Sequence, residues 1–227
     1  MTSELLECIE MNPETEPAYV VIWLHGLGAD GHDFEAIVPA LQLPAALPIR
    51  YVFPHAPMRP VTVNMGMVMR AWYDILEMDV SRKVDTGNIA TSSDQLKDLI
   101  QRELNAGIPS DRIVLAGFSQ GGAIALHTAL RYPEPLAGIL ALSTYLPTIE
   151  SLAAERSDAN RNLPIFMVHG EHDPVIPIVH AEDTREQLTR LGYAIQWRVY
   201  PMEHQVCNDE VGDIRTWMLA VMRPVSS

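Results

Sequence analysis

Apolar runs alternate with segments of helical spacing along most of the chain. Six runs are short and rich in aliphatic and β-branched residues: 18–24, 49–53, 112–118, 137–143, 164–170 and 195–200. Several are apolar throughout, which is typical of strands buried on both faces of a mainly parallel sheet. Between them, apolar residues recur every three or four positions, as in 96–104, 178–191 and 211–221. This alternation predicts an α/β fold with a mostly parallel central sheet flanked by helices.

Polar or glycine-rich turns follow four of the predicted strands. They are HGLGADGHDF after the first buried run, the turn at Ser119, HGEHDPVIP from His169, and PMEH after Tyr200. In sheets of this kind, ligands bind beyond the carboxyl ends of the strands. The candidate chemistry therefore gathers at one edge of the sheet.

Ser119 lies in the stretch LAGFSQGGAIAL, with a glycine two positions away on each side. A serine at a helix start often only caps the helix, because its hydroxyl accepts a hydrogen bond from a free N–H group. Capping makes no demand for Gly117 and Gly121. A nucleophile elbow does, because a sharp strand-to-helix turn leaves no room for side chains at these positions. Ser143 is a weaker rival nucleophile, since it lacks flanking glycines.

An activated serine needs a base to take its proton and an acid to orient that base. His204 lies in a turn after the last strand and before the last helix, from which it can reach the elbow. Asp173 lies just past a strand end, in a loop that prolines restrict, and Glu171 and Asp209 are the alternatives for the acid. The order Ser119, Asp173, His204 is the one that an elbow of this kind imposes.

The oxyanion that forms at the acyl carbon also needs hydrogen-bond donors. The N–H of Gln120 follows the nucleophile and lies at a helix N-terminus, where the helix dipole favours negative charge. We expect the second donor in the HGLGAD turn and choose the N–H of Leu27. The alternatives for this turn are a plain βα turn or a phosphate cradle. The cradle is disfavoured because the turn lacks both G-x-G-x-x-G and a Walker lysine.

Five motifs, LHGLGADGHDF, WYDI, GFSQGGA, HGEHDPVIP and YPMEH, together resemble the small carboxylesterase and acyl-protein thioesterase family of α/β-hydrolases, most closely its bacterial carboxylesterases. The resemblance covers nearly the whole chain. It implies an α/β-hydrolase fold without a large cap domain, with Ser119, Asp173 and His204 as the triad and the N–H groups of Leu27 and Gln120 as the oxyanion hole. Known members hydrolyse short to medium acyl esters, and some act on lysophospholipids or S-acylated proteins. Several are dimers.

Two positions depart from the family pattern. Glu203 stands before the triad histidine, where glycine is common. Its carboxylate either points into solvent or stabilises the imidazolium. Glu171 stands where aspartate is common, so the acid loop can be held differently.

A long connection from residue 54 to about residue 94 is too apolar for a plain solvent loop. It contains Trp72, Tyr73 and five methionines: Met58, Met65, Met67, Met69 and Met78. Flexible thioethers beside aromatic rings suit a groove that accepts varied acyl chains. We expect this segment to cover the active site, with Trp72, Met65 and Met67 contacting the substrate. The alternative is that the methionines fill a satellite core.

Composition and charge limit the remaining function classes. The 227 residues suffice for one domain spanning 1–227, and the formal net charge is -13. A protein with this negative charge repels nucleic-acid phosphates and anionic lipids. We therefore expect neither a nucleic-acid partner nor stable membrane association. The acidic N-terminus lacks the pattern of a signal peptide, which predicts a cytoplasmic location. Histidines and cysteines show no metal-ligand spacing, so we expect no metal and no cofactor.

The sequence thus predicts a serine carboxylesterase that hydrolyses short to medium chain carboxylic esters through an acyl-enzyme intermediate. Its expected partner is a small-molecule ester, and the family resemblance adds a homodimer as an expectation. An acyl-protein thioesterase or a lysophospholipase with the same triad is the nearest alternative. An alternative of another class is a non-catalytic binding protein with this fold.

Overall fold

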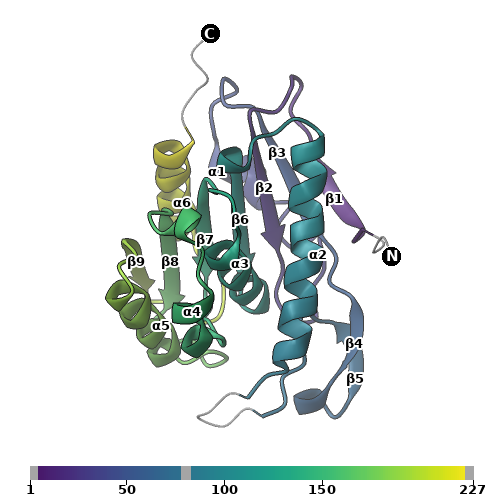
Figure 1. Cartoon of the computed structure of the whole chain (residues 1–227), viewed down its shortest axis with the longest axis vertical. Coiled ribbons are helices and arrows are strands. Elements are labelled where there is room, and N and C mark those ends of the chain that lie inside the picture. Colours follow the sequence, from purple (N-terminus) through teal and green to yellow (C-terminus); the bar gives the residue numbers. More distant parts are fainter. Residues whose placement is uncertain (1–4, 78–82, 223–227) are drawn as a thin grey trace.

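A seven-stranded sheet forms the centre of the protein in the computed structural model, which describes residues 5–77 and 83–222 (Figure 1). The strand order is β1-β3-β2-β6-β7-β8-β9, and only the β1–β3 pair is antiparallel within the sheet as described. The strands are β1 (Cys8–Met11), β2 (Tyr19–Leu24), β3 (Ile49–Pro54), β6 (Ile113–Phe118), β7 (Gly138–Leu142), β8 (Ile165–Gly170) and β9 (Ile195–Tyr200). The separate antiparallel hairpin of β4 (Met58–Val61) and β5 (Met67–Arg70) lies near the carboxyl ends of the sheet strands.

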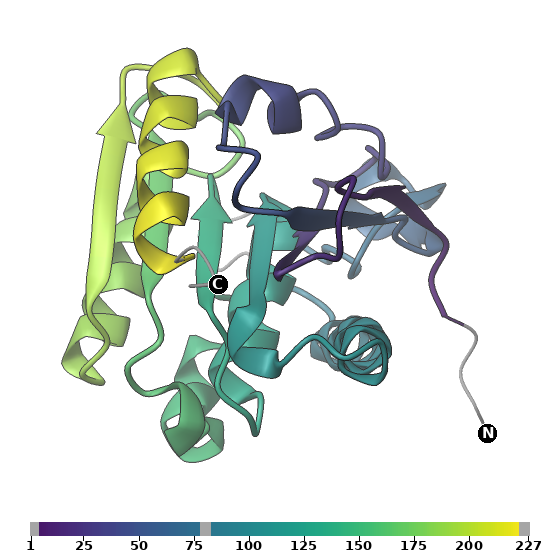
Figure 2. The same cartoon turned by 90° about the horizontal axis from the view of Figure 1, so that it is seen from above.

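Helices cover both faces of the sheet, as the view from above shows (Figure 2). The helices are α1 (Ile37–Leu41), α2 (Thr86–Asn105), α3 (Gln120–Arg131), α4 (Ile149–Glu155), α5 (Ile178–Arg190) and α6 (Asn208–Val221). Short 3-10 helices occupy Thr62–Asn64, Ser110–Arg112 and Asp158–Asn160. Helices α1 and α6 pack on one face and contribute to one apolar cluster, whereas α2 to α5 contribute to the cluster on the other face.

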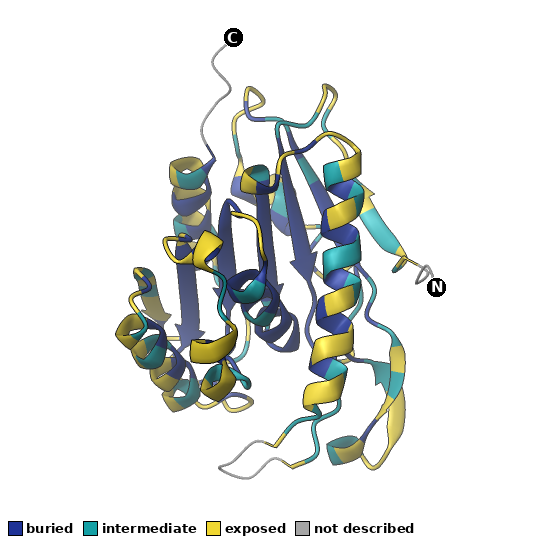
Figure 3. Ribbon diagram, viewed as in Figure 1, coloured by how far each residue is buried: buried dark blue, intermediate teal, exposed yellow. Residues whose placement is uncertain are grey.

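The central strands are buried on both sides (Figure 3). All six residues of β2 are buried, with Val20 and Ile22 in one apolar cluster and Val21 and Trp23 in the other. This explains why the sequence of the strand is apolar throughout, since neither face meets water. The polar turns at the strand ends are thereby set on a rigid support.

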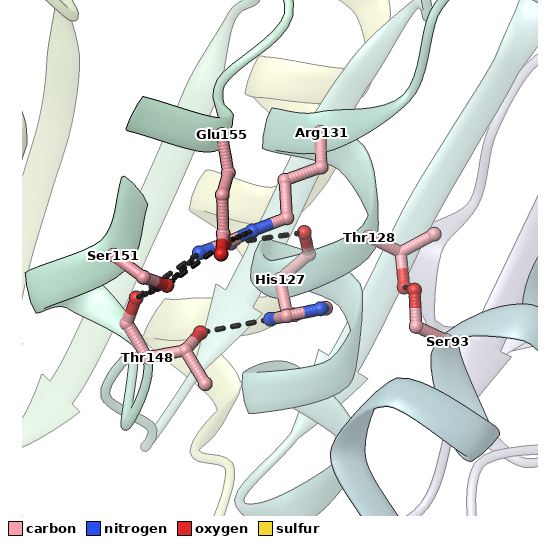
Figure 4. Close-up of polar contacts among 7 residues, drawn as sticks. All are labelled: Ser93, His127, Thr128, Arg131, Thr148, Ser151 and Glu155. Carbon is pink, nitrogen blue, oxygen red and sulfur yellow. Dashed lines mark hydrogen bonds and ion pairs between the residues drawn. The ribbon is translucent and has the colours of Figure 1, made fainter. Parts of the chain in front are cut away.

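A polar network ties α3 to α4 (Figure 4). Arg131 donates to Glu155 Oε2 at 2.7 Å and to the carbonyl of Thr148 at 3.1 Å, and His127 Nδ1 lies 2.8 Å from Thr148 Oγ1. Burial lowers the pKa of His127 to about 4, so its ring is neutral near pH 7. These contacts hold two helices together, which agrees with a structural role for His127.

The predicted fold class is confirmed, and each of the six predicted strands is present within one residue of its expected start. The sequence did not predict β1, β4 and β5, which are short and pair at or outside the edge of the main sheet. The long connection also ends earlier than expected, because α2 already begins at Thr86 with the Asp85 side chain accepting from the Asn88 N–H as its cap. Met78 lies outside the described residues.

Candidate active site

Ser119 occupies the sharp turn between β6 and α3. Its backbone has φ 55° and ψ -120°, a conformation that a residue with a side chain rarely adopts. The serine side chain makes no capping hydrogen bond to the helix. The capping interpretation of Ser119 is therefore wrong, and the strained turn is the one expected of a nucleophile elbow.

Close backbone packing accounts for the glycines on both sides of Ser119. A Cβ atom on Gly117 would lie 2.4 Å from the carbonyl carbon of Gly121, and one on Gly121 would lie 2.4 Å from the carbonyl oxygen of Leu24. Neither neighbour is a side chain that could turn away. Only glycine allows α3 to fold back this closely over the ends of β6 and β2.

Asp173 and His204 meet beside the elbow. His204 Nδ1 lies 2.7 Å from Asp173 Oδ2, and the other carboxylate oxygen accepts from the N–H groups of Val175 and Ile176 at 2.8 Å each. The imidazole ring of His204 packs against Phe118, which directly precedes Ser119, with 4.7 Å between the ring centroids. The turn that carries Asp173 and the turn that carries His204 thus meet each other, and His204 packs on the residue next to Ser119.

The electrostatics keep the Asp173 carboxylate charged. Burial by itself raises the pKa of this carboxyl, but hydrogen bonds from His169, His204 and the N–H of Ile176 outweigh it and hold the pKa well below its usual range. An ionised carboxylate at Nδ1 requires a proton on that nitrogen of His204. The opposite nitrogen, Nε2, is then left with a lone pair and can act as a base.

The turn after β2 is held by His25. The ring donates from Nδ1 to the carbonyl of Gly26 at 2.7 Å, and its Nε2 accepts from the N–H of Ala56 at 3.0 Å. Burial lowers the pKa of His25 to about 4, so the neutral ring can fill both roles. Neither the N–H of Leu27 nor that of Gln120 donates to another described residue. Both are thus available as hydrogen-bond donors beside Ser119.

The side chain of Gln120 clamps the segment after the hairpin. Its carbonyl accepts from the N–H of Trp72 at 2.7 Å, and its amide donates to the carbonyl of Tyr73 at 2.6 Å. Trp72 is fully buried and its indole N–H donates to the carbonyl of His25 at 2.9 Å. Together these hydrogen bonds connect the elbow, the turn after β2 and the segment at Tyr73.

An apolar cavity of about 190 Å³ opens onto Ser119. Its lining comes from six separate stretches of the chain and comprises Leu27, Val63, Asn64, Tyr73, Ile75, Ser119, Gln120, Tyr145, Val175 and Ile176. A larger hollow of about 400 Å³ near the start of β3 contains neither Ser119, Asp173 nor His204. The cavity at Ser119, unlike this larger hollow, combines a nucleophile with apolar walls.

The residues expected to contact substrate do not line this cavity. Trp72 lies behind the wall as a buried structural residue, because its indole N–H is used to hold the β2 turn. Met65 and Met67 are 95% and 60% exposed on the hairpin, and neither is part of the cavity lining. Tyr73 and Ile75 from the same connection form the wall instead. The sequence pattern could not separate Trp72 from its neighbour Tyr73.

The rival site residues are excluded by their positions. Ser143 is fully buried directly after β7, where a substrate has no access. Glu171 is exposed, and Asp209 is exposed in the first turn of α6. Glu203 is exposed as well, which agrees with a carboxylate that points into solvent. His169, the first residue of the HGEHDPVIP motif, is buried and lies 3.3 Å from Asp173 Oδ2, a contact that the sequence did not reveal.

Sequence comparison identifies one family along most of the chain. The Phospholipase/Carboxylesterase family of α/β-hydrolases matches residues 7–222. An acyl-protein thioesterase 1 from Neurospora crassa is 41% identical over 87% of this chain and 84% of its own length. An acyl-protein thioesterase 1 from Mycosarcoma maydis is 36% identical over 96% of this chain and 98% of its own length. These relatives are fungal, so the finer resemblance to bacterial carboxylesterases stays a prediction.

Solved structures share the fold. SOBER1 from Arabidopsis thaliana is 28% identical, with a TM-score of 0.85 over 90% of this chain and 99% of that one. The acyl-protein thioesterase 2 from Zea mays is 25% identical, with a TM-score of 0.84 over 96% of this chain and 99% of that one. Within the described residues, no helix is both long and apolar enough to cross a lipid bilayer.

Proposed function

Because this chain belongs to the phospholipase/carboxylesterase family of α/β-hydrolases, we propose that it is a serine hydrolase that removes acyl groups from thioesters, through an acyl-enzyme on Ser119. The observation that carries the proposal is the hydrogen bond of 2.7 Å between Asp173 and His204, beside a serine held in a strained turn. The family includes relatives named as acyl-protein thioesterases, which favours a thioester on a protein cysteine as the substrate.

The reaction begins at Ser119. His204 Nε2 accepts the hydroxyl proton while Ser119 Oγ attacks the acyl carbon. The carbonyl oxygen becomes an oxyanion that accepts hydrogen bonds from the N–H groups of Leu27 and Gln120. Asp173 stabilises the imidazolium form of His204 during this step. The removal of one oxyanion donor of this kind typically lowers kcat about 10²- to 10³-fold.

Collapse of the tetrahedral intermediate breaks the carbon–sulfur bond. The imidazolium of His204 gives its proton to the departing thiolate, which leaves as a thiol, and the acyl group remains on Ser119 Oγ. A water molecule then attacks the acyl-enzyme with His204 as the base. The second intermediate releases the carboxylic acid and returns the proton to Ser119.

A carboxylesterase acting on short to medium esters is the second candidate. The cavity of about 190 Å³ is smaller than the roughly 300–1,000 Å³ typical of small-molecule sites. A short acyl chain fits such a cavity, whereas a longer chain must extend along the surface beyond it. An oxygen ester uses the same steps with an alcohol as the leaving group.

The two candidates are separated by kcat/KM for matched oxygen esters and thioesters with acyl chains of increasing length. Each series is measured with wild type, with Ser119→Ala and with Tyr73→Ala, which removes one cavity wall. We expect thioesters to be preferred, Ser119→Ala to be inactive, and Tyr73→Ala to move the preference to longer chains. A preference for short oxygen esters would favour the carboxylesterase. Full activity of folded Ser119→Ala would refute both.

A further inference from the structure

His169 is a histidine inside the site that the proposed reaction does not use. It is the fifth residue of β8, and its side chain is fully buried, as is that of Asp173 four residues later. The turn after β8 folds back so that His169 Nε2 lies 2.8 Å from the carbonyl oxygen of Ile176 and 3.3 Å from Asp173 Oδ2. The carboxylate oxygen that meets His204 therefore meets a second histidine.

The surroundings of His169 determine which ring nitrogen carries the proton. Two oxygen acceptors lie beside Nε2, whereas Nδ1 is buried and has no hydrogen-bond partner among the described residues. A carbonyl oxygen cannot donate, so the contact with Ile176 requires a proton on Nε2. The Nε2–H group then donates to the Ile176 carbonyl, and Asp173 Oδ2 lies 3.3 Å from the same nitrogen.

A buried nitrogen without a partner destabilises the fold, and an apolar side chain at this position would avoid that cost. The imidazole is also fixed in place, because the ring of Trp197 on β9 stacks beside it with 6.4 Å between centroids. A histidine that is packed this rigidly and leaves Nδ1 without a partner must have a role for its other nitrogen. That nitrogen is Nε2, which lies near Asp173.

We propose that His169 is a positioning residue for the reaction: its Nε2–H holds Asp173 Oδ2 in the direction of His204. The backbone N–H groups of Val175 and Ile176 hold only the other oxygen, Oδ1. Without His169, Oδ2 has His204 as its one side-chain partner among the described residues, and the acid and base lose their fixed relative orientation. The kinetic part of this inference rests on the proposed function.

The test compares His169→Gln with His169→Met. The two side chains have nearly the same length and shape, but only glutamine offers an N–H donor near the position of Nε2. We expect His169→Met to lower kcat about 10- to 100-fold with little change in KM, as for other small misplacements of catalytic groups. We expect His169→Gln to recover most of the loss.

The same two substitutions at His127 provide a control, because that half-buried histidine bonds to Thr148 in the α3–α4 network. Thermal unfolding identifies any variant that loses stability. At His127 both variants should retain wild-type kcat. Equal kcat for His169→Met and His169→Gln, whether both normal or both reduced, would overturn the proposal.

Proton NMR gives a readout that does not depend on turnover. The proton between His204 Nδ1 and Asp173 should give a far-downfield signal, which His169→Met shifts or broadens and His169→Gln restores. In wild type labelled with ¹⁵N-histidine, His169 should carry its proton on Nε2. A proton on Nδ1 instead would overturn the proposal even if His169→Met does not fold. Wild type that hydrolyses nothing would refute the proposed function, while the tautomer would still decide the role of His169.

Discussion

The turn that carries Asp173 and the hairpin of β4 and β5 lie near the same end of the sheet, yet they differ in how firmly their side chains are held. We call residues 170–177 the acid turn and residues 58–70 the methionine hairpin. In the acid turn, both oxygens of Asp173 are hydrogen bonded and the carboxylate is buried. In the methionine hairpin, Met65 is 95% exposed, and Met58, Met67 and Val68 are also exposed.

The contrast shows that the candidate catalytic groups are held rigidly, whereas the exposed side chains of the hairpin are not. Catalytic groups need positions fixed to a fraction of an ångström, and the acid turn achieves this because it follows a strand that is buried on both faces. The methionine hairpin is attached to the site by its backbone, since the N–H of Gly28 donates to the carbonyl of Arg70 at 2.9 Å. Its exposed side chains are therefore free to vary without moving the catalytic groups.

The largest expected change in kcat comes from a substitution in the acid turn itself. Asp173→Asn should lower kcat about 10⁴-fold, because an amide neither stabilises the imidazolium nor fixes the proton on His204 Nδ1. Asp209→Asn is the control, since Asp209 is exposed on α6 and is expected to leave kcat unchanged. Steady-state kinetics on one good substrate checks both. A loss of less than tenfold for Asp173→Asn would mean that this carboxylate is not the partner of the base.

The next largest expected effect is a loss of stability and activity from a substitution in the nucleophile elbow. Gly121→Ala should destabilise the protein by about 3 kcal/mol and lower activity, because the new methyl group meets the carbonyl oxygens of Leu24 and His25 at 2.4 and 2.6 Å. Gly212→Ala in α6 is a matched control, since a Cβ there meets nothing within 4 Å. It should stabilise the protein by about 1 kcal/mol through helix propensity. Urea unfolding measures both, and equal stabilities would contradict the packing argument.

A smaller expected effect is the pH dependence of stability that comes from Glu210, six residues after His204. Burial raises the pKa of Glu210 in α6 to about 8, from an ordinary value of 4.5. Between these values the folded protein holds a proton that the unfolded chain has released, so stability falls as pH rises from about 5 to 8. Glu210→Gln keeps an acceptor for the N–H of Cys207 but removes the titration.

We therefore expect the Tm of Glu210→Gln, relative to wild type, to rise with pH across this window. The hairpin offers the comparison, since Met65→Ser adds no titratable group and should leave the pH dependence of Tm as in wild type. Parallel Tm curves for Glu210→Gln and wild type would show that Glu210 is ionised in the fold.

The smallest expected effects come from substitutions in the methionine hairpin. Met65→Ser and Met67→Ser should change stability by less than about 0.5 kcal/mol, because both side chains are largely exposed. The kcat/KM for a short ester should stay within about twofold of wild type, because neither residue lines the cavity. A larger loss for short esters would show that the hairpin contacts the substrate after all.

The same contrast explains what the sequence could and could not predict. The elbow was predictable because Gly117, Ser119 and Gly121 lie within five consecutive residues, and their spacing is itself the geometric requirement. Asp173 and His204 followed from the rule that functional turns lie at the carboxyl ends of parallel strands. In both cases a local pattern carries three-dimensional information.

Other features depend on contacts that no local pattern records. Trp72 and Tyr73 are neighbours with similar side chains, and long-range hydrogen bonds to His25 and Gln120 fix which of the two lines the cavity. The methionine content of the connection predicted a groove, but composition does not say which side chains of a hairpin meet solvent. The spacing of four between His169 and Asp173 was visible, but its meaning depends on how the turn after β8 folds back.

The central claim, that Ser119 is an activated nucleophile, is tested most directly by a fluorophosphonate that forms a covalent bond with activated serines. After digestion, mass spectrometry locates the adduct in folded wild type, in Ser119→Ala and in thermally unfolded wild type. We predict one adduct, on Ser119, in the folded wild type alone. An unlabelled wild type, or an adduct on another residue such as Ser143, would contradict the account and would favour a binding protein with a hydrolase fold.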